Sequence, residues 1–152
     1  MRCFLLILPV LFLSCDFFQP QIPSIPREAI NPPDAPAAIG PYSQAIKLGP
    51  ALYCSGQIAL NPATGDLVTG DIQAETRQVL KNLGAVLRAA GMDYQHVVSA
   101  TVYLSNLDDY KIVNEIYAEF FTAAKPARAT VQVARLPRDA HVEISCIAIK
   151  TE

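Results

Sequence analysis

The sequence predicts an α+β domain in which two helices cover one face of a single mixed β-sheet. From residue 39 onward, short runs rich in β-branched and aromatic residues alternate with two longer segments whose apolar residues recur at helical spacing. The runs follow one another in the order strand, strand, helix, strand, helix, strand, strand (ββαβαββ). This order allows both helices to pack on the same side of one sheet.

The first two expected strands form a hairpin. Residues 44–48 and 51–60 are apolar runs separated by Gly49-Pro50, a dipeptide that is typical of turns. A loop over residues 61–70 follows, because proline and two glycines interrupt any regular pattern there.

The first expected helix begins after Asp71 and ends at Gly91. The Asp71 carboxylate suits the N-cap position, and glycine is the usual residue just beyond the C-terminus of a helix. Its apolar residues fall on one helical face: Val79, Leu80, Leu83, Val86, Leu87 and Ala90. Such an amphipathic helix should cover a sheet.

A third strand is expected over residues 97–105, which are rich in Val, Thr and Tyr. A second helix follows it, with Asn106 or Asp108 as its cap, and Pro126 marks the limit beyond which it cannot continue. The apolar positions of this helix are Val113, Ile116, Tyr117, Phe120 and Phe121.

The last two expected strands cover residues 127–136 and 141–150, on either side of a short loop. Both alternations of the final strand are partly apolar. We therefore expect the sheet face without helices to meet another protein surface, and a homo-oligomer is the simplest such arrangement.

The N-terminus has the composition of an export signal. Arg2 precedes an apolar run of about 11 residues, which is well short of the roughly 20 that a membrane-spanning helix needs. Ser14 directly before Cys15 is the lipobox arrangement, in which the cysteine is lipidated. We expect a signal peptide over residues 1–15 and an exported lipoprotein whose only membrane contact is the lipid. The alternative is an N-terminal extension on a cytoplasmic protein.

Residues 16–38 are expected to form a spacer with little packed structure. They contain six of the 12 prolines: Pro20, Pro23, Pro26, Pro32, Pro33 and Pro36. Proline at this density disfavours both helix and central strand. Residues 39–152 then form the one globular domain, since 152 residues leave no room for a second.

Composition and residue spacing argue against several classes of function. A formal net charge of -2 provides no broad positive surface for nucleic acid. Cys54 and Cys146 lie in apolar runs and should be buried, while His96 and His141 are isolated from each other, so we expect no metal site. No phosphate-binding or dinucleotide-binding glycine pattern is present, and we expect no cofactor.

Short motifs are spread over the whole expected domain. They are Gly40-Pro41-Tyr42-Ser43-Gln44-Ala45, Ser55-Gly56-Gln57-Ile58, Val113-Asn114-Glu115-Ile116-Tyr117, Pro126-Ala127-Arg128-Ala129-Thr130, Val133-Ala134-Arg135-Leu136-Pro137 and Val142-Glu143-Ile144. Together they resemble the Rid family, also called YjgF. The resemblance implies a chorismate-mutase-like α+β trimer with active sites between subunits. It also implies hydrolytic deamination of 2-imino acids, such as 2-iminobutanoate and 2-iminopropanoate, to 2-oxo acids and ammonia.

Arg128 and Glu143 are the expected catalytic pair. The planar guanidinium of Arg128 matches a substrate carboxylate with two parallel hydrogen bonds, and the resemblance implies this role. The alternative is an arginine paired with a surface carboxylate. Partial burial of Glu143 would raise its pKa and let it handle water and the departing nitrogen, a role that the resemblance also implies. The alternative is a glutamate paired with an arginine across the sheet.

Five further residues complete the expected site by resemblance: Tyr42, Ser55, Gly56, Asn114 and Ala129. Tyr42 is expected to be catalytic, and the hydroxyl of Ser55 and the amide of Asn114 are expected to bind substrate. Backbone amides at Gly56 and Ala129 would approach the carboxylate closely, which glycine permits. The alternatives are a packing aromatic for Tyr42 and a solvated helix residue for Asn114.

A geometric argument separates the two catalytic residues within one chain. If the last two strands form a hairpin, Ala134 lies opposite Glu143, and Arg128 is about six residues or roughly 20 Å farther along. A site that uses both would need two subunits.

A non-catalytic binding or chaperone-like trimer remains the alternative function. The acidic balance of the chain disfavours a translation-inhibiting or endoribonuclease version.

Overall fold

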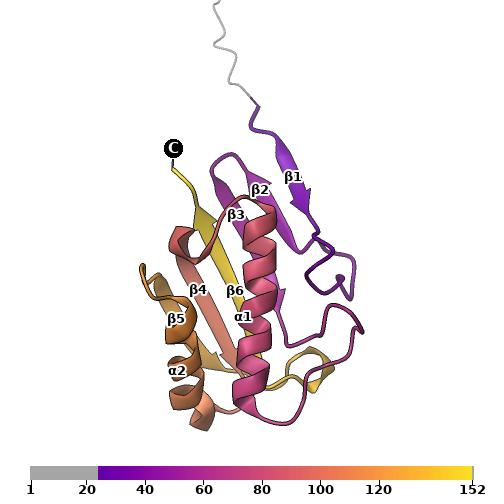
Figure 1. Cartoon of the computed structure of the whole chain (residues 1–152), viewed down its shortest axis with the longest axis vertical. Helices are drawn as coiled ribbons and strands as arrows, with labels where there is room; N and C mark the ends of the chain where they lie inside the picture. The colour runs from indigo at the N-terminus through magenta and orange to yellow at the C-terminus, as the bar shows by residue number, and fades with distance from the viewer. Residues whose placement is uncertain (1–23, 152) are drawn as a thin grey trace, which may run out of the picture.

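The computed structural model describes residues 24–151. The expected signal peptide, Cys15 and the first part of the expected spacer lie outside the described residues. The elements along the chain are β1 (Arg27–Ile30), β2 (Ala45–Leu48), β3 (Ala51–Gln57), α1 (Ile72–Ala89), η1 (Tyr94–His96), β4 (Val97–Leu104), η2 (Leu107–Asp109), α2 (Tyr110–Phe120), β5 (Ala127–Gln132), η3 (Pro137–Asp139) and β6 (Val142–Ile149) (Figure 1). No helix within residues 24–151 has the length and apolar content needed to cross a membrane.

One six-stranded sheet contains all the strands, in the order β1-β2-β3-β6-β4-β5. Neighbouring strands are antiparallel except β4 and β5, which are parallel. The sheet is therefore mixed, and the α+β class with two helices on one sheet is confirmed.

The edge strand β1 comes from the stretch that was expected to be a spacer. Arg27 pairs with Leu48 and Ile30 pairs with Ala45, and Ile30 and Ala35 are buried. The expectation of little packed structure is therefore wrong for the described part of that stretch. The physical reason is that β1 itself contains no proline, so its backbone N–H groups remain available for pairing.

The last two strands do not form the expected hairpin. β4 lies between them, pairing Ala100 with Arg128 of β5 and Tyr103 with Glu143 of β6. The physical reason is that α2 connects β4 to β5 as the crossover that parallel neighbours need, and this places β5 at the edge of the sheet.

Both helices form where the apolar spacing predicts them. The Asp71 carboxylate caps α1 by accepting a 2.7 Å hydrogen bond from the Ala74 N–H, and all six predicted apolar residues of that helix are buried. Asn106 caps η2, the short turn that leads into α2, by accepting from the Asp108 N–H. Cys54 and Cys146 face each other across β3 and β6 and are buried and free, as expected.

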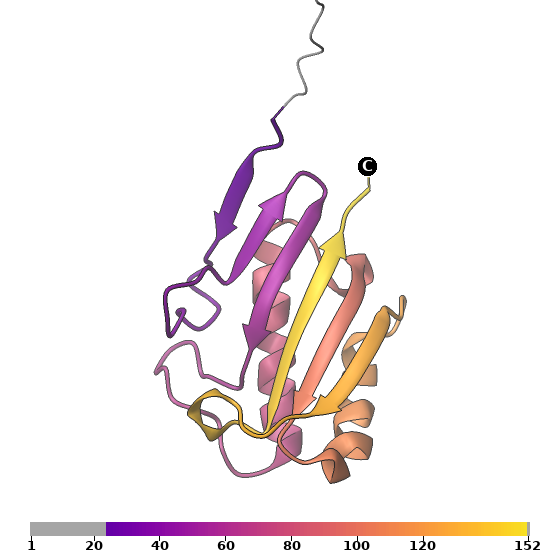
Figure 2. The same cartoon turned by 180° about the vertical axis from the view of Figure 1, so that it is seen from behind.

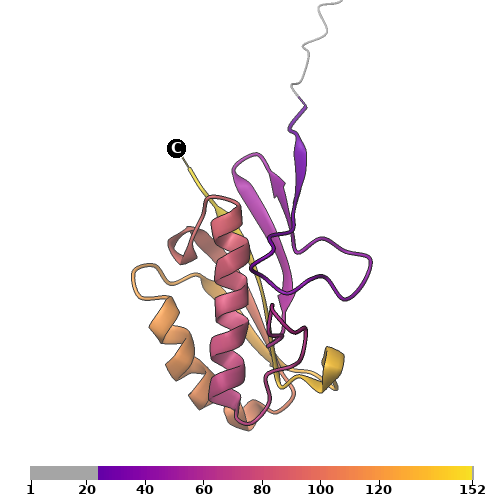
Figure 3. The same cartoon turned by 45° about the vertical axis from the view of Figure 1, so that its right-hand side comes forward.

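The helices cover one face of the sheet and leave the other without a helical layer (Figures 2 and 3). Alternate residues of β6 show the division, because Val142 and Ile144 are buried beneath the helices while Glu143 and Ile147 point to the open face. Exposed apolar side chains whose strand positions place them on the open face are Leu48, Tyr53, Val131 and Ile149. This open apolar surface agrees with the expectation that the face meets another protein surface.

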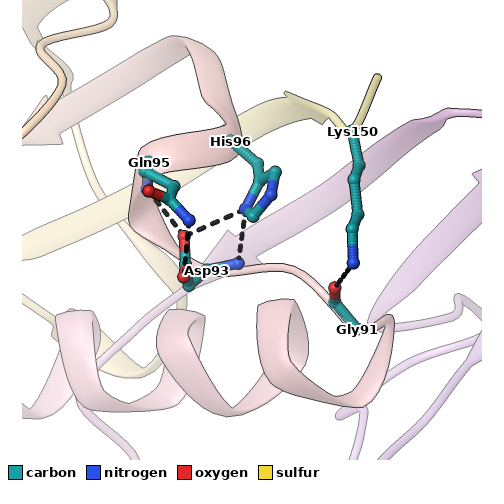
Figure 4. A network of polar contacts seen from close by, with 5 residues as sticks. All are labelled: Gly91, Asp93, Gln95, His96 and Lys150. Carbon is teal, nitrogen blue, oxygen red and sulfur yellow. Dashed lines mark hydrogen bonds and ion pairs between the residues drawn. The ribbon is translucent and has the colours of Figure 1, made fainter. Parts of the chain in front are cut away.

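A polar network fixes the connection between α1 and β4 (Figure 4). The Asp93 carboxylate accepts from the Gln95 N–H, and the Asp93 N–H donates to Nδ1 of His96, each at 3.0 Å. Lys150 donates from Nζ to the Gly91 carbonyl at 2.9 Å and so ties the end of β6 to the same turn. His96 is thus a capping residue of η1.

Candidate functional site

A first pocket gathers four of the seven expected site residues at one end of the open sheet face. Tyr42, Ser55, Gly56 and Glu143 line a cavity of about 260 Å³, together with Ile39, Ile58 and Pro137. Because these residues come from the loop before β2, from β3, from β6 and from the loop at η3, long-range strand pairing assembles the pocket.

An irregularity in the pairing of β3 with β6 contains Ser55 and Gly56. Ser55 and Gly56 lie between the pairs Cys54 with Cys146 and Gln57 with Ile144, so two residues of β3 face one residue of β6. Bulges of this kind redirect side chains and occur near functional sites.

The Glu143 side chain lies directly over Gly56. A Cβ atom at position 56 would overlap Oε1 of Glu143 and would lie 2.6 Å from its Cδ. Glycine is therefore required at this position for the carboxylate to occupy its place beside the backbone of β3.

Glu143 has no protein partner for its charge within residues 24–151. No ion pair or side-chain hydrogen bond involves it there, so the alternative of a pair with an arginine across the sheet is not found in this part of the chain. Partial burial raises the pKa of the Glu143 carboxyl above its ordinary value. The group therefore holds a proton more readily than an exposed glutamate does.

Hydrogen bonds to the preceding loop hold the other polar groups of the first pocket. The Ser55 hydroxyl donates to the Ser43 carbonyl at 2.8 Å, and the Ser55 N–H donates to the Gln44 carbonyl at 3.0 Å. The Tyr42 hydroxyl accepts from the Ile39 N–H, and its ring is exposed rather than packed in the core. These contacts fix two hydroxyls beside Glu143.

A second pocket, of about 440 Å³, contains Arg128 and Asn114. Its other lining residues are Tyr117, Ala118, Phe121, Lys125 and Pro126. The pocket lies where α2 and the segment after it meet the start of β5, on the helix side of the sheet.

The Arg128 guanidinium is held in a fixed orientation. Its Nη2 donates a 2.6 Å hydrogen bond to Oδ1 of Asn114, and its Cζ lies 4.6 Å from the centre of the Tyr117 ring, a cation–π contact. Asn114 is thus a supporting residue rather than a solvated one. No carboxylate pairs with Arg128 within residues 24–151, and its remaining N–H donors are available to a ligand.

Two tyrosines lie next to Arg128, and their pKa values are shifted in opposite directions. A hydrogen bond with Asn114 and the positive charge of Arg128 lower the pKa of Tyr110. Burial raises the pKa of Tyr117 to about 12, and the Tyr117 hydroxyl has no hydrogen-bond partner within residues 24–151. The sequence analysis did not name Tyr110, Tyr117, Lys125 or Pro137 as site residues.

The two pockets lie on opposite faces of the sheet. Arg128 pairs with Ala100 of β4 and Glu143 pairs with Tyr103, and positions three apart on one strand point to opposite faces. Their Cα atoms are about 14 Å apart, from three residues along β4 and two strand spacings across it. One chain does not bring both groups to one small molecule. Ala129 lines neither pocket.

Comparisons with known proteins agree with this fold. A model of the family described as endoribonuclease L-PSP matches residues 32–150. A mouse protein named 2-iminobutanoate/2-iminopropanoate deaminase is 50% identical over 127 residues, which are 84% of this chain and 94% of that protein. A RutC family protein of Pyrococcus horikoshii is 51% identical over 124 residues, covering 82% of this chain and 98% of its own length.

Two solved structures give the same agreement in three dimensions. The YjgF gene product of E. coli superposes with a TM-score of 0.79 at 44% identity, covering 82% of this chain and 99% of that chain. E. coli TdcF with bound serine superposes with a TM-score of 0.79 at 40% identity and the same coverage of both chains.

Proposed function

Since the chain belongs to the endoribonuclease L-PSP family, the Rid/YjgF family of its motifs, we propose that it hydrolyses 2-imino acids to 2-oxo acids and ammonia. The observation that carries this proposal is the oriented guanidinium of Arg128, which has no carboxylate partner within residues 24–151. The names of close relatives as 2-iminobutanoate/2-iminopropanoate deaminases support the same substrates.

Arg128 binds the substrate carboxylate in this proposal. A 2-imino acid carries its carboxylate next to the electrophilic carbon of the C=N bond, so two parallel hydrogen bonds from one guanidinium fix the position of that carbon. The contacts with Asn114 and Tyr117 limit the motion of Arg128 before substrate arrives. Preorganisation of this kind lowers the entropic cost of reaching the transition state.

Glu143 handles the protons. It takes a proton from water as the water oxygen bonds to the imine carbon, and it gives this proton to the nitrogen, which forms a carbinolamine. It then takes the hydroxyl proton as the C=O bond forms and gives it to the same nitrogen as the C–N bond breaks, so that ammonia leaves with both protons and Glu143 is ionised again. The raised pKa of Glu143 suits a group that must both accept and donate near neutral pH. Tyr42 and Ser55 place hydroxyls beside this water.

The complete site lies between two subunits of a homotrimer in this proposal. Arg128 comes from one subunit and Glu143 from its neighbour, because the two lie on opposite faces within one chain. The exposed apolar residues of the open sheet face supply a surface for that association.

Subunit mixing tests the proposed function and its assembly together. We expect Arg128→Ala and Glu143→Gln each to lower kcat/KM for the hydrolysis of 2-iminobutanoate by at least about 10²-fold. Threonine dehydratase generates this imine and semicarbazide traps it. After exchange of equal amounts of the two variants, about a quarter of the sites should combine an intact Arg128 with an intact Glu143, with the same share of wild-type activity. No hydrolysis by the wild-type trimer would contradict the function. No recovery after verified exchange would contradict the shared site.

Export with lipidation of Cys15 is proposed on the sequence alone. Cells that express the full chain and grow with an alkyne fatty acid should label it, and Cys15→Ser should remove the label. Equal labelling of both proteins would contradict lipidation at Cys15.

A further inference from the structure

The Arg128 pocket contains a second cation, Lys125. Lys125 lines the same cavity of about 440 Å³ and is separated from Arg128 by two residues, one of them Pro126. No residue that lines this pocket carries a negative charge, and no ion pair or hydrogen bond involves Lys125 within residues 24–151. Two positive groups thus share one pocket without a counter-charge in the described chain.

One carboxylate does not account for this arrangement. The α-carboxylate of an imino acid uses two parallel N–H donors of Arg128 and leaves the Lys125 ammonium unmatched. Two cations in one cleft repel each other and raise the positive electrostatic potential there. A ligand with two negative groups therefore binds better than a ligand with one.

The remaining wall of the pocket agrees with a ligand that has an acidic side chain. Tyr117 is 6% exposed, and its hydroxyl has no partner within residues 24–151. A buried hydroxyl without a partner is unusual and gains a hydrogen bond when an acceptor enters the pocket. The aromatic rings of Tyr117 and Phe121, stacked with centroids 4.1 Å apart, give the methylene groups of such a ligand an apolar contact.

We propose that the preferred substrates are 2-imino acids with a second carboxylate on the side chain, namely the imines of aspartate-like and glutamate-like amino acids. Arg128 binds the α-carboxylate and Lys125 binds the side-chain carboxylate, while the hydrolysis itself is unchanged. This inference rests on the proposed deaminase function and specifies its substrate class. Such imines are produced by oxidation of dicarboxylic amino acids, so a reaction of that class would supply the substrate.

Competition kinetics with two imines test the inference. An aspartate oxidase supplies 2-iminosuccinate and threonine dehydratase supplies 2-iminobutanoate, and semicarbazide trapping reports kcat/KM for each. Because Lys125 is exposed, we expect wild-type protein to prefer the dicarboxylic imine by about threefold to fivefold, the contribution of one exposed ion pair. Lys125→Gln should remove this preference, mainly through KM, and Lys125→Arg should restore most of it.

A matched control is Lys111→Gln, which removes an exposed lysine of α2 that does not line the pocket and should leave the ratio of the two kcat/KM values unchanged. Gel filtration verifies that each variant keeps the oligomeric state of the wild type. Activity on 2-iminobutanoate without a preference for 2-iminosuccinate would overturn this inference and leave the deaminase function intact. Equal losses on both imines in Lys125→Gln would overturn it as well. No activity on either imine would instead contradict the proposed function.

Discussion

Two glutamates, Glu75 and Glu143, occupy contrasting environments in this domain. Glu75, in the first turn of α1, is 1% exposed, and its two oxygens lie 3.1 Å from the His141 backbone N–H and 3.0 Å from the His141 ring Nδ1. Glu143 is half-buried over Gly56 and has no protein partner within residues 24–151. A fully partnered buried carboxylate holds structure together, whereas an unpartnered one is available to water and substrate.

The two environments are linked through the start of β6. His141 precedes this strand by one residue, and its carbonyl accepts a 3.0 Å hydrogen bond from the Ser105 N–H. Glu75 therefore anchors the strand end from which Glu143 projects two residues later. Substitutions at the two glutamates should separate stability from chemistry.

The largest expected effect is the loss of activity in Glu143→Gln. Glutamine keeps the shape but transfers no proton, so kcat/KM for 2-iminobutanoate should fall by about 10²- to 10⁴-fold. The midpoint of urea unfolding should stay the same or rise, because the variant removes a desolvated acid that has no partner. A marked loss of stability with retained activity would reverse the assignment of the two glutamates.

Gly56→Ala tests whether the position of Glu143 matters. The new methyl group would overlap the carboxylate, so Glu143 must move away from β3, and kcat/KM should fall by about 10²-fold, as small misplacements of reacting groups do. Gly65→Ala is not a suitable control, because Gly65 has φ +75 and strain would affect it. Gly84→Ala is suitable, since its added Cβ also crowds a side chain, the Tyr94 hydroxyl at 2.7 Å, and Tyr94 lines neither pocket. Equal activity in both variants would show that the chemistry does not depend on this placement.

Glu75→Gln should reduce the free energy of unfolding by about 1–3 kcal/mol, the range for a buried hydrogen bond to a charged group. Urea unfolding provides the measurement, and kcat for the remaining folded protein should change less than in Glu143→Gln. Glu119→Gln is the matched control, because Glu119 forms an exposed ion pair with Arg77 that should add no measurable stability. A larger destabilisation from Glu119→Gln would contradict the structural role of Glu75.

The smallest expected effect is a dependence of stability on pH. The hydrogen bond to Glu75, and then the charges of Glu75 and Asp109, raise the pKa of His141. Its stabilisation is therefore complete below the ordinary histidine pKa of about 6.5 and is lost as pH rises through the raised value. The stability difference between wild type and Glu75→Gln should shrink as pH rises from about 6.5 through the raised pKa of His141. A difference that grows with pH would contradict this linkage.

Local sequence patterns predicted both helices, but they did not predict the order of the strands in the sheet. The apolar spacing of α1 corresponds directly to its buried face, because helical periodicity is a property of neighbouring residues. The insertion of β4 between β5 and β6 depends on a crossover between distant segments, which no local pattern specifies. β1 was missed because prolines on both sides of Arg27–Ile30 outweighed a run of only four residues.

The separation of Arg128 and Glu143 within one chain was predicted, but from a hairpin that does not form. Resemblance to a family supplied Arg128 and Glu143, since a strand arginine or glutamate has no distinguishing pattern of its own. The contact of Arg128 with Tyr117 was not foreseen, because the apolar spacing of the second helix identifies Tyr117 as a packing residue and says nothing about which side chain of β5 its ring meets. Tertiary pairing alone reveals that the two pockets lie on opposite faces.

The sheet order also determines how this protein is best immobilised. β1 and β5 form the two outer edges, five strand spacings or about 24 Å apart. A fusion partner or a sensor surface attached ahead of β1 is therefore joined at the edge farthest from Arg128. Coupling chemistry directed to that end would leave the Arg128 pocket beside β5 open to solution, whereas coupling through Lys125, which lines that pocket, would block it.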